Sequence, residues 1–269
     1  MIHKTAIIQK GAKVHPEASI GPYCTIGKNV EIGRGVKLHS HVCIEGFSYI
    51  GENTEIFPFA SIGYPPQDLK YGGEESRVII GKNNVIREYC TVNTGTVHGN
   101  METVIGDSCL FMISSHVAHD CIVGDNVILA NNATLGGHVI LDNNVIIGGL
   151  AAIHQFVRIG KFAIIGGVSA VVEDVAPFAS VAGDRAKIIG INIVGMKRNS
   201  YSKNSINIVK NVFKEIFNKD NNKGFDEKIR VIKSNYNNDD ESKEIIKFLE
   251  INSKRGFCMP SHKWELNDQ

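Results

Sequence analysis

Four histidines lie within 39 residues of one another in the middle of the chain: His116, His119, His138 and His154. An imidazole titrates near neutral pH, so it can take a proton from a hydroxyl group as that group attacks an electrophile. Asp120 could then orient the ring. Alternatively, three neutral imidazoles can hold a catalytic zinc ion with one open position. The spacing of the histidines does not choose between these two chemistries.

A period of six residues determines how these histidines are placed. An isoleucine, valine or leucine stands at every sixth position over 2–62 and again over 80–92. The series resumes, offset by one residue, over 105–171, where Phe111 is the one member that is not a branched aliphatic residue. This period fits neither a helix nor a two-sided strand. It is typical of the hexapeptide β-helix, whose short strands each send one aliphatic side chain inward.

Glycine often follows the periodic residue, as at Gly21, Gly27 and Gly33. We expect these glycines to mark corners, because glycine turns sharply without a Cβ clash. Three sides of six residues would close a triangular coil of about 18 residues, and successive coils would stack about 4.8 Å apart.

Such a coil would turn distant histidines into a vertical cluster. His119 and His138 are 19 residues apart, and His138 and His154 are 16 apart, so each step is about one coil. The three rings should therefore lie along nearly the same edge, within about 10 Å of rise. Asn131 and Gln155 fall in the same zone. The sequence thus predicts a site here.

Two polar segments leave the repeat, at 64–77 and 94–102, and read as protruding loops. Loops carry function more often than the scaffold beneath them. After about Ile188 the repeat stops and helical patterns begin. We predict a β-helix over 1–187 and a small helical domain over 188–269 that could cover one open end of the coil.

Three helices are expected in that domain, over 203–218 with Ser202 as its cap, over 225–235 and over 239–253. The tail after Arg255 is predicted to be flexible.

Composition narrows the class of protein. The net charge of +1 gives no reason to expect nucleic-acid binding, although a basic run over 187–214 is either a solvated face or a dock for an acidic partner or a pyrophosphate. The six cysteines show no disulfide or metal-binding spacing, which favours a reducing cytoplasm. No segment is long and apolar enough to cross a bilayer. The repeat begins at Ile2, which leaves no room for a signal peptide.

Four segments together resemble the UDP-N-acetylglucosamine O-acyltransferase family: HVAHDCIVGDNVILANNATLGGHV (116–139), AAIHQF (151–156), QDLKY (67–71) and INIVGMKR (191–198). The resemblance implies a left-handed parallel β-helix, a cytoplasmic homotrimer with sites between neighbouring columns, and the first step of lipid A biosynthesis. The implied substrates are UDP-N-acetylglucosamine and a 3-hydroxyacyl chain on the phosphopantetheine arm of acyl carrier protein. No metal or other cofactor is implied.

The resemblance also implies catalytic roles. His119 would be the general base that takes the proton from the sugar 3-hydroxyl while its oxygen attacks the thioester. The backbone N–H of Gly137 would hold the oxyanion, and such a donor is typically worth about 3 kcal/mol. Asp120 would keep His119 in the useful tautomer.

Five further residues are implied to bind the nucleotide sugar or the carrier arm. Gln67, Asp68 and Lys70, in the first loop, would contact the nucleotide sugar. Asn192 and Arg198 would meet the nucleotide or the phosphopantetheine arm.

Five more residues are implied to line the cleft. Asn132, His138 and Gln155 would form its wall, with His154 beside them. Gly167 matches a position that limits acyl length in the family, and a glycine there would leave room for a long chain.

Three positions depart from the common family pattern: Asn93 replaces a frequent histidine, Val194 a frequent glutamate and Asn199 a frequent arginine. The last two thin the polar contacts expected around the uridine and pyrophosphate. N-acylation of a 3-amino sugar nucleotide is therefore kept as an alternative.

Two alternatives lie outside the acyltransferases. One is a γ-class carbonic anhydrase-like zinc enzyme on the same coil, with His116, His119 and His138 as candidate ligands. The other is a non-catalytic scaffold that uses the column for assembly.

Overall fold

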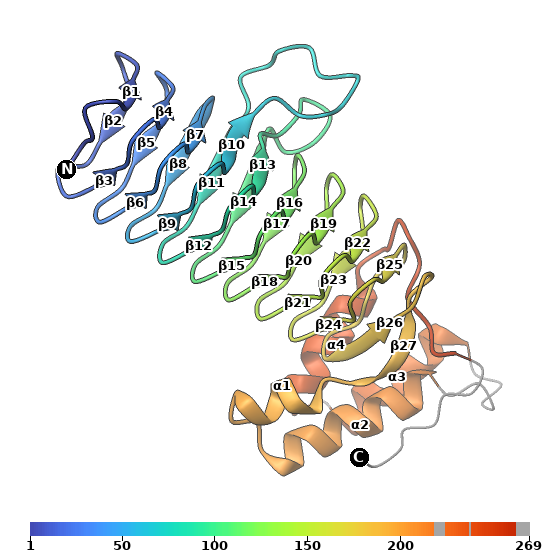
Figure 1. The fold of residues 1–269 in the computed structure, drawn as a ribbon. Coiled ribbons are helices and arrows are strands. Elements are labelled where there is room, and N and C mark those ends of the chain that lie inside the picture. Colours follow the sequence, from blue (N-terminus) through green and yellow to red (C-terminus); the bar gives the residue numbers. More distant parts are fainter. Residues whose placement is uncertain (218–223, 237, 262–269) are drawn as a thin grey trace.

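The computed structural model describes residues 1–217, 224–236 and 238–261, and it is dominated by three flat sheets that wind around a common axis (Figure 1). Each sheet is numbered here by its first strand. In the described chain, sheet 1 has nine strands: β1 (Ile7–Ile8), β4 (Thr25–Ile26), β7 (Cys43–Ile44), β10 (Ser61–Tyr64), β13 (Thr91–Asn93), β16 (His116–Val117), β19 (Thr134–Leu135), β22 (Ala152–Ile153) and β25 (Ala170–Val171).

Among the same residues, sheet 2 has eight strands: β2 (Lys13–Val14), β5 (Glu31–Ile32), β8 (Phe47–Ile50), β11 (Arg77–Ile80), β14 (Glu102–Ile105), β17 (Ile122–Val123), β20 (Ile140–Leu141) and β23 (Arg158–Ile159). Sheet 3 has ten within the described ranges: β3 (Ser19–Ile20), β6 (Lys37–Leu38), β9 (Glu55–Ile56), β12 (Val85–Ile86), β15 (Leu110–Phe111), β18 (Ile128–Leu129), β21 (Ile146–Ile147), β24 (Ile164–Ile165), β26 (Ala179–Ala182) and β27 (Lys187–Ile191).

Neighbouring strands pair in parallel and in an 18-residue register, as in Ile8 with Ile26 and Ile26 with Ile44. The strand pair β26–β27 is antiparallel and closes sheet 3. From Ile20 onward the periodic residues point into the coil and are almost fully buried, with Ile44, Ile62 and Ile80 all at 0% exposure, whereas Ile2 at the open end is 52% exposed. The predicted mainly β fold, a left-handed parallel β-helix, is confirmed.

Three edges separate the sheets. The chain turns from sheet 1 to sheet 2 at edge A, from sheet 2 to sheet 3 at edge B, and from sheet 3 back to sheet 1 at edge C. The two long loops, 65–76 between β10 and β11 and 94–101 between β13 and β14, both leave the coil at edge A (Figure 1). They touch each other, because the Val97 amide donates to the Glu74 carboxylate at 3.0 Å.

The reason given above for the glycines is wrong. Gly21 and Gly51 do not have the positive φ of a sharp left-handed turn, and a Cβ on Gly51 would lie 2.5 Å from the Gly81 carbonyl carbon of the next coil. Glycine is needed there because adjacent backbones approach closely. The left-handed residue comes three positions after the inward aliphatic one, as at Asn53 with φ 56°.

The C-terminal helices cover the last coil (Figure 1): α1 (Ile193–Arg198), α2 (Lys203–Phe217), α3 (Phe225–Asn235) and α4 (Asp240–Glu250). The cap predicted for α2 is confirmed, since the Ser202 hydroxyl accepts from the Ser205 amide at 3.0 Å. In the described ranges, no helix has both the length and the apolar character that crossing a membrane requires. The predicted end of the first helix, Asn218, lies outside the described residues.

The tail predicted to be flexible is instead docked as far as Pro260. Phe257 pairs with Asp174 and Pro260 pairs with Ile188, as isolated bridges beside the last coil. Cys258 is 1% exposed, and burial raises the pKa of its thiol to about 12, so it packs as an uncharged small residue. The sequence missed this docking because a bridge of one residue leaves no periodic pattern. Residues 262–269 lie outside the described chain.

Arg158 joins the coil to the helical domain. Its Nε and Nη2 bind the Asp174 carboxylate at 2.8 and 2.7 Å, with the two side chains 13% and 1% exposed. Its guanidinium also lies 4.7 Å from the Phe248 ring centroid and donates to the Ile251 carbonyl at 3.2 Å.

Replacing Arg158 by methionine should therefore lower the free energy of unfolding by about 3 to 5 kcal/mol, because it leaves Asp174 buried and unpaired. The matched control is Lys13→Met, which breaks an exposed pair with Glu31 and should cost less than about 1 kcal/mol. Urea unfolding at one protein concentration measures both. Equal losses in the two variants would contradict this role for Arg158.

Candidate active site at one edge of the coil

Edge A brings together residues from three successive coils. Asp120, His138 and Phe156 occupy the same left-handed turn position, with φ of 60°, 62° and 67°. His116 pairs with Thr134 across sheet 1, which sets Gly137 above His119. The 18-residue register therefore makes two vertical columns, Asp120–His138–Phe156 and His119–Gly137–Gln155.

His119 and Asp120 form a short hydrogen bond, with Nδ1 of the ring 2.8 Å from Oδ2 of the carboxylate. The second loop surrounds the same carboxylate. The Asp120 oxygens accept hydrogen bonds from the Thr96 amide at 3.0 Å, the Thr96 hydroxyl at 2.7 Å and the Asn100 amide at 2.9 Å. These donors explain why the chain leaves the coil at 94–101. Sequence reasoning missed Thr96 and Asn100.

The charge state of Asp120 follows from these contacts. Burial opposes ionisation, but the hydrogen bonds from His119, Thr96 and Asn100 together outweigh it and lower the pKa to about 2. The carboxylate is therefore ionised near neutral pH and holds the proton of His119 on Nδ1. Nε2 is then free to accept a proton.

His138 lies edge-on to His119, with ring centroids 5.0 Å apart and planes at 88°. On its other side it stacks on Phe156 at 4.3 Å and 7°. Burial lowers the pKa of His138, an effect that Asp120 opposes and that His119 and Lys254 reinforce. His138 is therefore a neutral imidazole at neutral pH.

His154 does not complete the predicted stack of three rings. Because it comes 16 rather than 18 residues after His138, Phe156 takes the place above that ring. His154 is exposed at the same edge, and its Nδ1 lies 3.2 Å from the Gln155 carbonyl. The prediction that His119 and His138 lie together is confirmed.

Gly137 lies directly against the catalytic candidate His119. A Cβ added to Gly137 would lie 2.5 Å from both Cε1 and Nε2 of the His119 ring. In the described part of the chain, the Gly137 amide has no hydrogen-bond acceptor. Nε2 of His119 thus lies beside a residue whose backbone N–H makes no hydrogen bond within the described residues, and such a pair can take up a proton and stabilise an oxyanion.

The first loop extends from the same edge. Gln67 and Lys70 are exposed, and the Lys70 amide donates to the Asp68 side chain at 3.0 Å. Asp68 is near enough to raise the pKa of His138 against the effect of burial. All three predicted loop residues are therefore on the side of the molecule that carries His119.

Four predicted site residues lie at other edges. Asn132 and Gly167 are exposed at edge C, in turns before β19 and β25. Asn192 is 7% exposed and caps α1, because its side chain accepts from the Gly195 amide and donates to the Phe162 carbonyl at edge B, both at 2.9 Å. Arg198 is exposed at the end of α1.

One copy of the chain therefore does not assemble the whole predicted site. In one copy Asn132 and Asn192 lie at other edges than His138, and a side of six residues spans about 20 Å. Because the resemblance places the sites between neighbouring columns, the contacts expected of these two residues stay predictions. The polar groups of the Asn192 side chain hold α1 in place.

A cavity of about 300 Å³ opens next to His138 at edge A. Its lining includes residues that sequence reasoning missed, among them His98, Asn100, Asn252 and Lys254. Asn252 and Lys254 follow the last helix, where no repeat or period could connect them with edge A.

The fold does not bring together the three histidines expected as ligands in the zinc alternative. Among the described residues, the side chains that could share a metal ion are His119, Asp120 and His138, whose ligand atoms lie within 4.8 Å of one another. His116 instead binds the Thr91 hydroxyl at 2.7 Å through Nδ1. Burial, reinforced by His119, lowers the pKa of His116.

Comparison with known protein families gives two matches. Residues 174–258 match domain 2 of the UDP-N-acetylglucosamine O-acyltransferase family, and residues 11–46 and 102–137 match the bacterial transferase hexapeptide (six repeats). The first match begins ahead of the domain boundary predicted at 188. It also extends into the docked C-terminal segment.

Similar proteins cover nearly the whole chain. Proteins from Thermodesulfovibrio yellowstonii and Rickettsia canadensis, both named acyl-(acyl-carrier-protein)–UDP-N-acetylglucosamine O-acyltransferase, are each 51% identical over 96% of this chain and over 98% and 97% of their own lengths. The solved UDP-N-acetylglucosamine acyltransferase from Campylobacter jejuni has a TM-score of 0.91 and is 37% identical over 97% of this chain and 100% of that one. Another solved UDP-N-acetylglucosamine acyltransferase has a TM-score of 0.93 and is 44% identical over 97% of this chain and 99% of its own.

Proposed function

Because this chain belongs to the acyl-(acyl-carrier-protein)–UDP-N-acetylglucosamine O-acyltransferase family, we propose that His119 is the general base of its acyl transfer. The enzyme moves an acyl chain from acyl carrier protein to an oxygen of UDP-N-acetylglucosamine. This sets aside the carbonic anhydrase and scaffold alternatives. The observation that carries the proposal is the 2.8 Å bond between His119 Nδ1 and Asp120 with Gly137 against the ring.

In the proposed step, Nε2 of His119 takes the proton of the sugar 3-hydroxyl as that oxygen attacks the thioester carbon. The oxyanion that forms accepts a hydrogen bond from the Gly137 amide. When the intermediate collapses, the C–S bond breaks and Nε2 of His119 gives its proton to the departing thiolate. Asp120 stabilises the imidazolium throughout, as in other carboxylate–histidine pairs.

The same proposal assigns the substrates. The acyl group is a 3-hydroxyacyl chain delivered on the phosphopantetheine arm, so the reaction needs no metal or other cofactor. Gln67, Asp68 and Lys70 contact the nucleotide sugar, and His138 and Gln155 line the groove. His154 lies at its outer rim. The reaction is the first step of lipid A biosynthesis and takes place in the cytoplasm.

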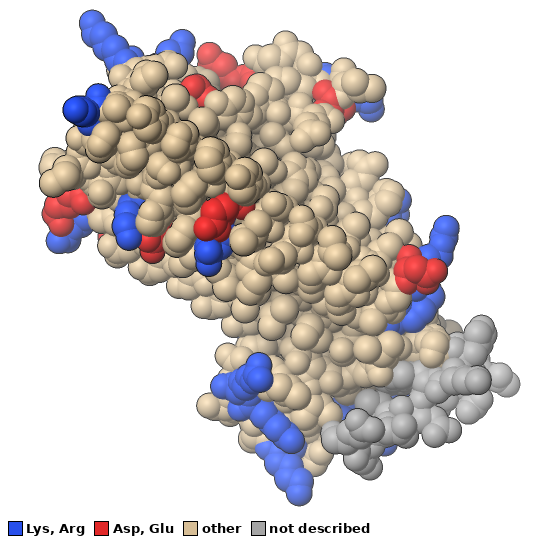
Figure 2. Space-filling model, viewed as in Figure 1, with Lys and Arg blue, Asp and Glu red and all other residues tan. Residues whose placement is uncertain are grey.

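We further propose that the enzyme is a homotrimer, and the outer faces of the sheets support this. The outward residues of sheets 2 and 3 are partly exposed and apolar along the middle coils, whereas those of sheet 1 are mainly threonine, serine and alanine. In sheet 2 they are Ile79, Val104, Ile122 and Ile140, and in sheet 3 Val85, Leu110, Ile128, Ile146 and Ile164. On the face shown in Figure 2, the broad central stretch between the two ends of the column is largely uncharged.

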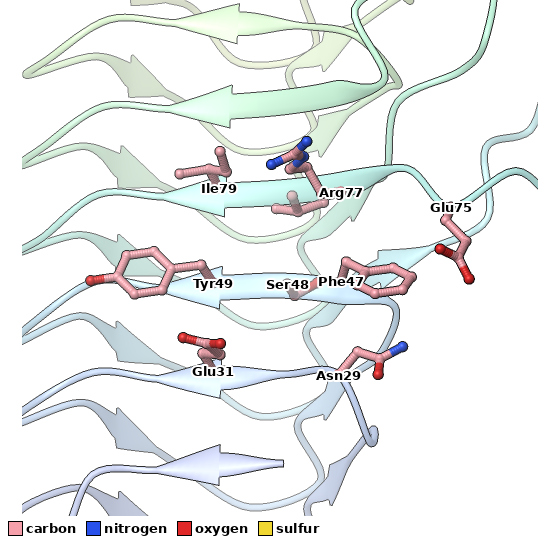
Figure 3. Close-up of a pocket in the computed structure, with 9 residues that line it drawn as sticks. Asn29, Glu31, Phe47, Ser48, Tyr49, Glu75, Arg77 and Ile79 are labelled. Carbon is pink, nitrogen blue, oxygen red and sulfur yellow. The ribbon is translucent and has the colours of Figure 1, made fainter. Parts of the chain in front are cut away.

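Figure 3 shows the N-terminal part of the sheet 2 face, where Phe47 and Tyr49 project from β8 and Ile79 from β11. With the charged residues Glu31, Glu75 and Arg77 they line a cavity of about 550 Å³. Phe47 and Tyr49 are 40% and 44% exposed and lie two residues apart on β8, so they form part of a contiguous apolar patch of the kind that marks an interaction surface. A second copy that packs its sheet 3 here would cover them.

Such a contact joins two different faces, and it closes a ring of three when each copy is rotated by a third of a full rotation from the last. With sheet 1 outermost in every copy, edge A of one copy borders edge C of the next. Asn132 and Gly167 of one copy then reach the groove that holds His119 of its neighbour, where Gly167 leaves room for a long acyl chain. The split of the site residues between edges supports this arrangement.

Mass spectrometry of the product tests the reaction. The full-length protein is given UDP-N-acetylglucosamine and a mixed pool of acyl carrier thioesters, and we expect one 3-hydroxyacyl group joined through an alkali-labile ester. A parallel reaction with the 3-amino analogue reports whether an alkali-stable amide also forms. No acylated nucleotide from either acceptor would refute the proposed function.

Sedimentation of the purified protein tests the trimer. We expect a mass of three chains for the wild type and a loss of that species in Ile146→Glu, because the charge would be buried against sheet 2 of the next copy. The control is Thr134→Glu on sheet 1, which should remain trimeric. A monomeric wild type, or a trimeric Ile146→Glu variant, would contradict the proposed contact.

A further inference from the structure

Lys254 is brought to edge A by a segment that begins where α4 ends. It lines the 300 Å³ cavity together with His98 and Asn100 of the second loop and with His138 and Phe156 of the coil. Neither the repeat nor the helical pattern places a residue there. The cavity therefore joins three parts of the chain that are far apart in sequence.

This segment is held on both sides of Lys254. Arg158 donates to the Ile251 carbonyl at 3.2 Å, and Arg255 Nε donates to the Gln155 carbonyl at 2.9 Å. The next residues pair with the last coil through Phe257. Lys254 thus projects from a fixed backbone and not from a free tail.

The charge of Lys254 is not neutralised by the described residues. Its Nζ lies 5.0 Å from the Phe156 ring centroid, and within 1–217, 224–236 and 238–261 it makes no ion pair or hydrogen bond. The other cation of the cavity, Arg158, is neutralised by Asp174, and the carboxylate of Asp120 is taken up by His119 and the second loop.

The remaining lining favours an anion. His98 and Asn252 add polar side chains to the lining, and Phe156 supplies an aromatic ring over which the Lys254 ammonium lies. A lysine ammonium of this kind binds phosphate oxygens as a point charge. A cavity of about 300 Å³ has room for one phosphate ester and its flanking atoms.

We propose that Lys254 binds a phosphate ester of one substrate in this cavity and so anchors that substrate next to His119. The inference rests on the proposed function, because both substrates of that reaction carry such a group: a diphosphate in the sugar nucleotide and a phosphodiester in the carrier arm. The role is in binding, so it should appear in affinity and not in the chemical step.

Isothermal titration of the full-length protein tests this. UDP-N-acetylglucosamine and free phosphopantetheine are titrated separately into wild type, Lys254→Met, Lys254→Arg and the control Lys243→Met, whose lysine pairs with Asp240 on α4. For one of the two ligands we expect Lys254→Met to raise Kd roughly tenfold at low salt, with Lys254→Arg and the control near wild type. The ligand that loses affinity identifies the source of the phosphate.

Steady-state kinetics separates binding from an effect on His138. We expect KM for the same substrate to rise about as much as Kd, while kcat at saturation and its pH profile stay within about twofold of wild type. Unchanged affinity for both ligands in Lys254→Met would overturn the inference, and so would a fall in kcat with KM unchanged. If the wild type bound neither ligand, the proposed function itself would fail.

Discussion

His119→Ala should lose two to four orders of magnitude in kcat, about the full contribution of a positioned general base. Nε2 is the one unprotonated ring nitrogen at the point where His119 meets Gly137, because Asp120 fixes the proton on Nδ1. Without it the sugar hydroxyl must attack before it has lost its proton. Single-turnover rates with saturating nucleotide sugar and acyl carrier thioester measure the effect.

The fold should survive this change, since His119 lies in the turn between β16 and β17 and is not part of the aliphatic core. The sedimenting mass should stay that of the wild type. His3→Ala, an exposed histidine of the first coil, is the control and should keep full activity. Normal turnover by His119→Ala would remove the base from the mechanism, whatever the rest of the site does.

Gly137→Ala should lower kcat by about two orders of magnitude although it keeps the amide donor. The added methyl group would lie 2.5 Å from His119 Nε2, so the ring must move by roughly an ångström. A misplacement of this size typically costs about a hundredfold. Because alanine retains the N–H, the loss would report the position of the base and not the loss of the oxyanion donor.

The control for this change is Gly190→Ala, where an added methyl group meets no atom within 4 Å. It should leave the rate unaltered. A crystal structure of the Gly137→Ala protein should show the His119 ring turned away from residue 137. Wild-type activity in this variant would mean that the ring does not work in the position described here.

The fold could be predicted from the sequence because one simple rule repeats. An aliphatic residue at a periodic position, such as Ile44 or Ile62, is expected to be buried, and the constant spacing of these residues predicts the three sheets. The two loops were equally visible, since prolines and charges interrupt the period. The helices followed from their apolar stripes, and α2 begins at the predicted residue.

The site was only partly predictable. The sequence gives the number of residues between two histidines, but it does not say at which point of the 18-residue turn each one lies. His119 and His138 differ by 19 residues and meet, whereas His138 and His154 differ by 16 and do not. The difference of three residues is half a side of the coil. The glycine rule failed for a related reason, since the close approach of two backbones depends on a neighbour 18 or more residues away.

Contacts that bridge the two domains could not be predicted at all. Arg158 and Lys254 each depend on how the helical domain sits on the last coil, and no spacing rule links one to the other. Asn192 looked like a ligand contact because its family position suggested one. The fold shows a structural role that the sequence did not suggest, since the Asn192 side chain caps α1.

The 18-residue register has a consequence for how this enzyme can change in length. Removing one complete turn near the N-terminus, for example 19–36, would shorten the column and leave every neighbour of His119 where it is. Removing a single residue between Asp120 and His138 would shift every later strand by one residue. Each inward isoleucine after that point would then face outward, and the His119 and His138 rings would no longer lie together. Full turns can therefore be added or lost in evolution on the N-terminal side of the reaction centre. The number of residues in the turns that carry His119 and His138 must stay the same.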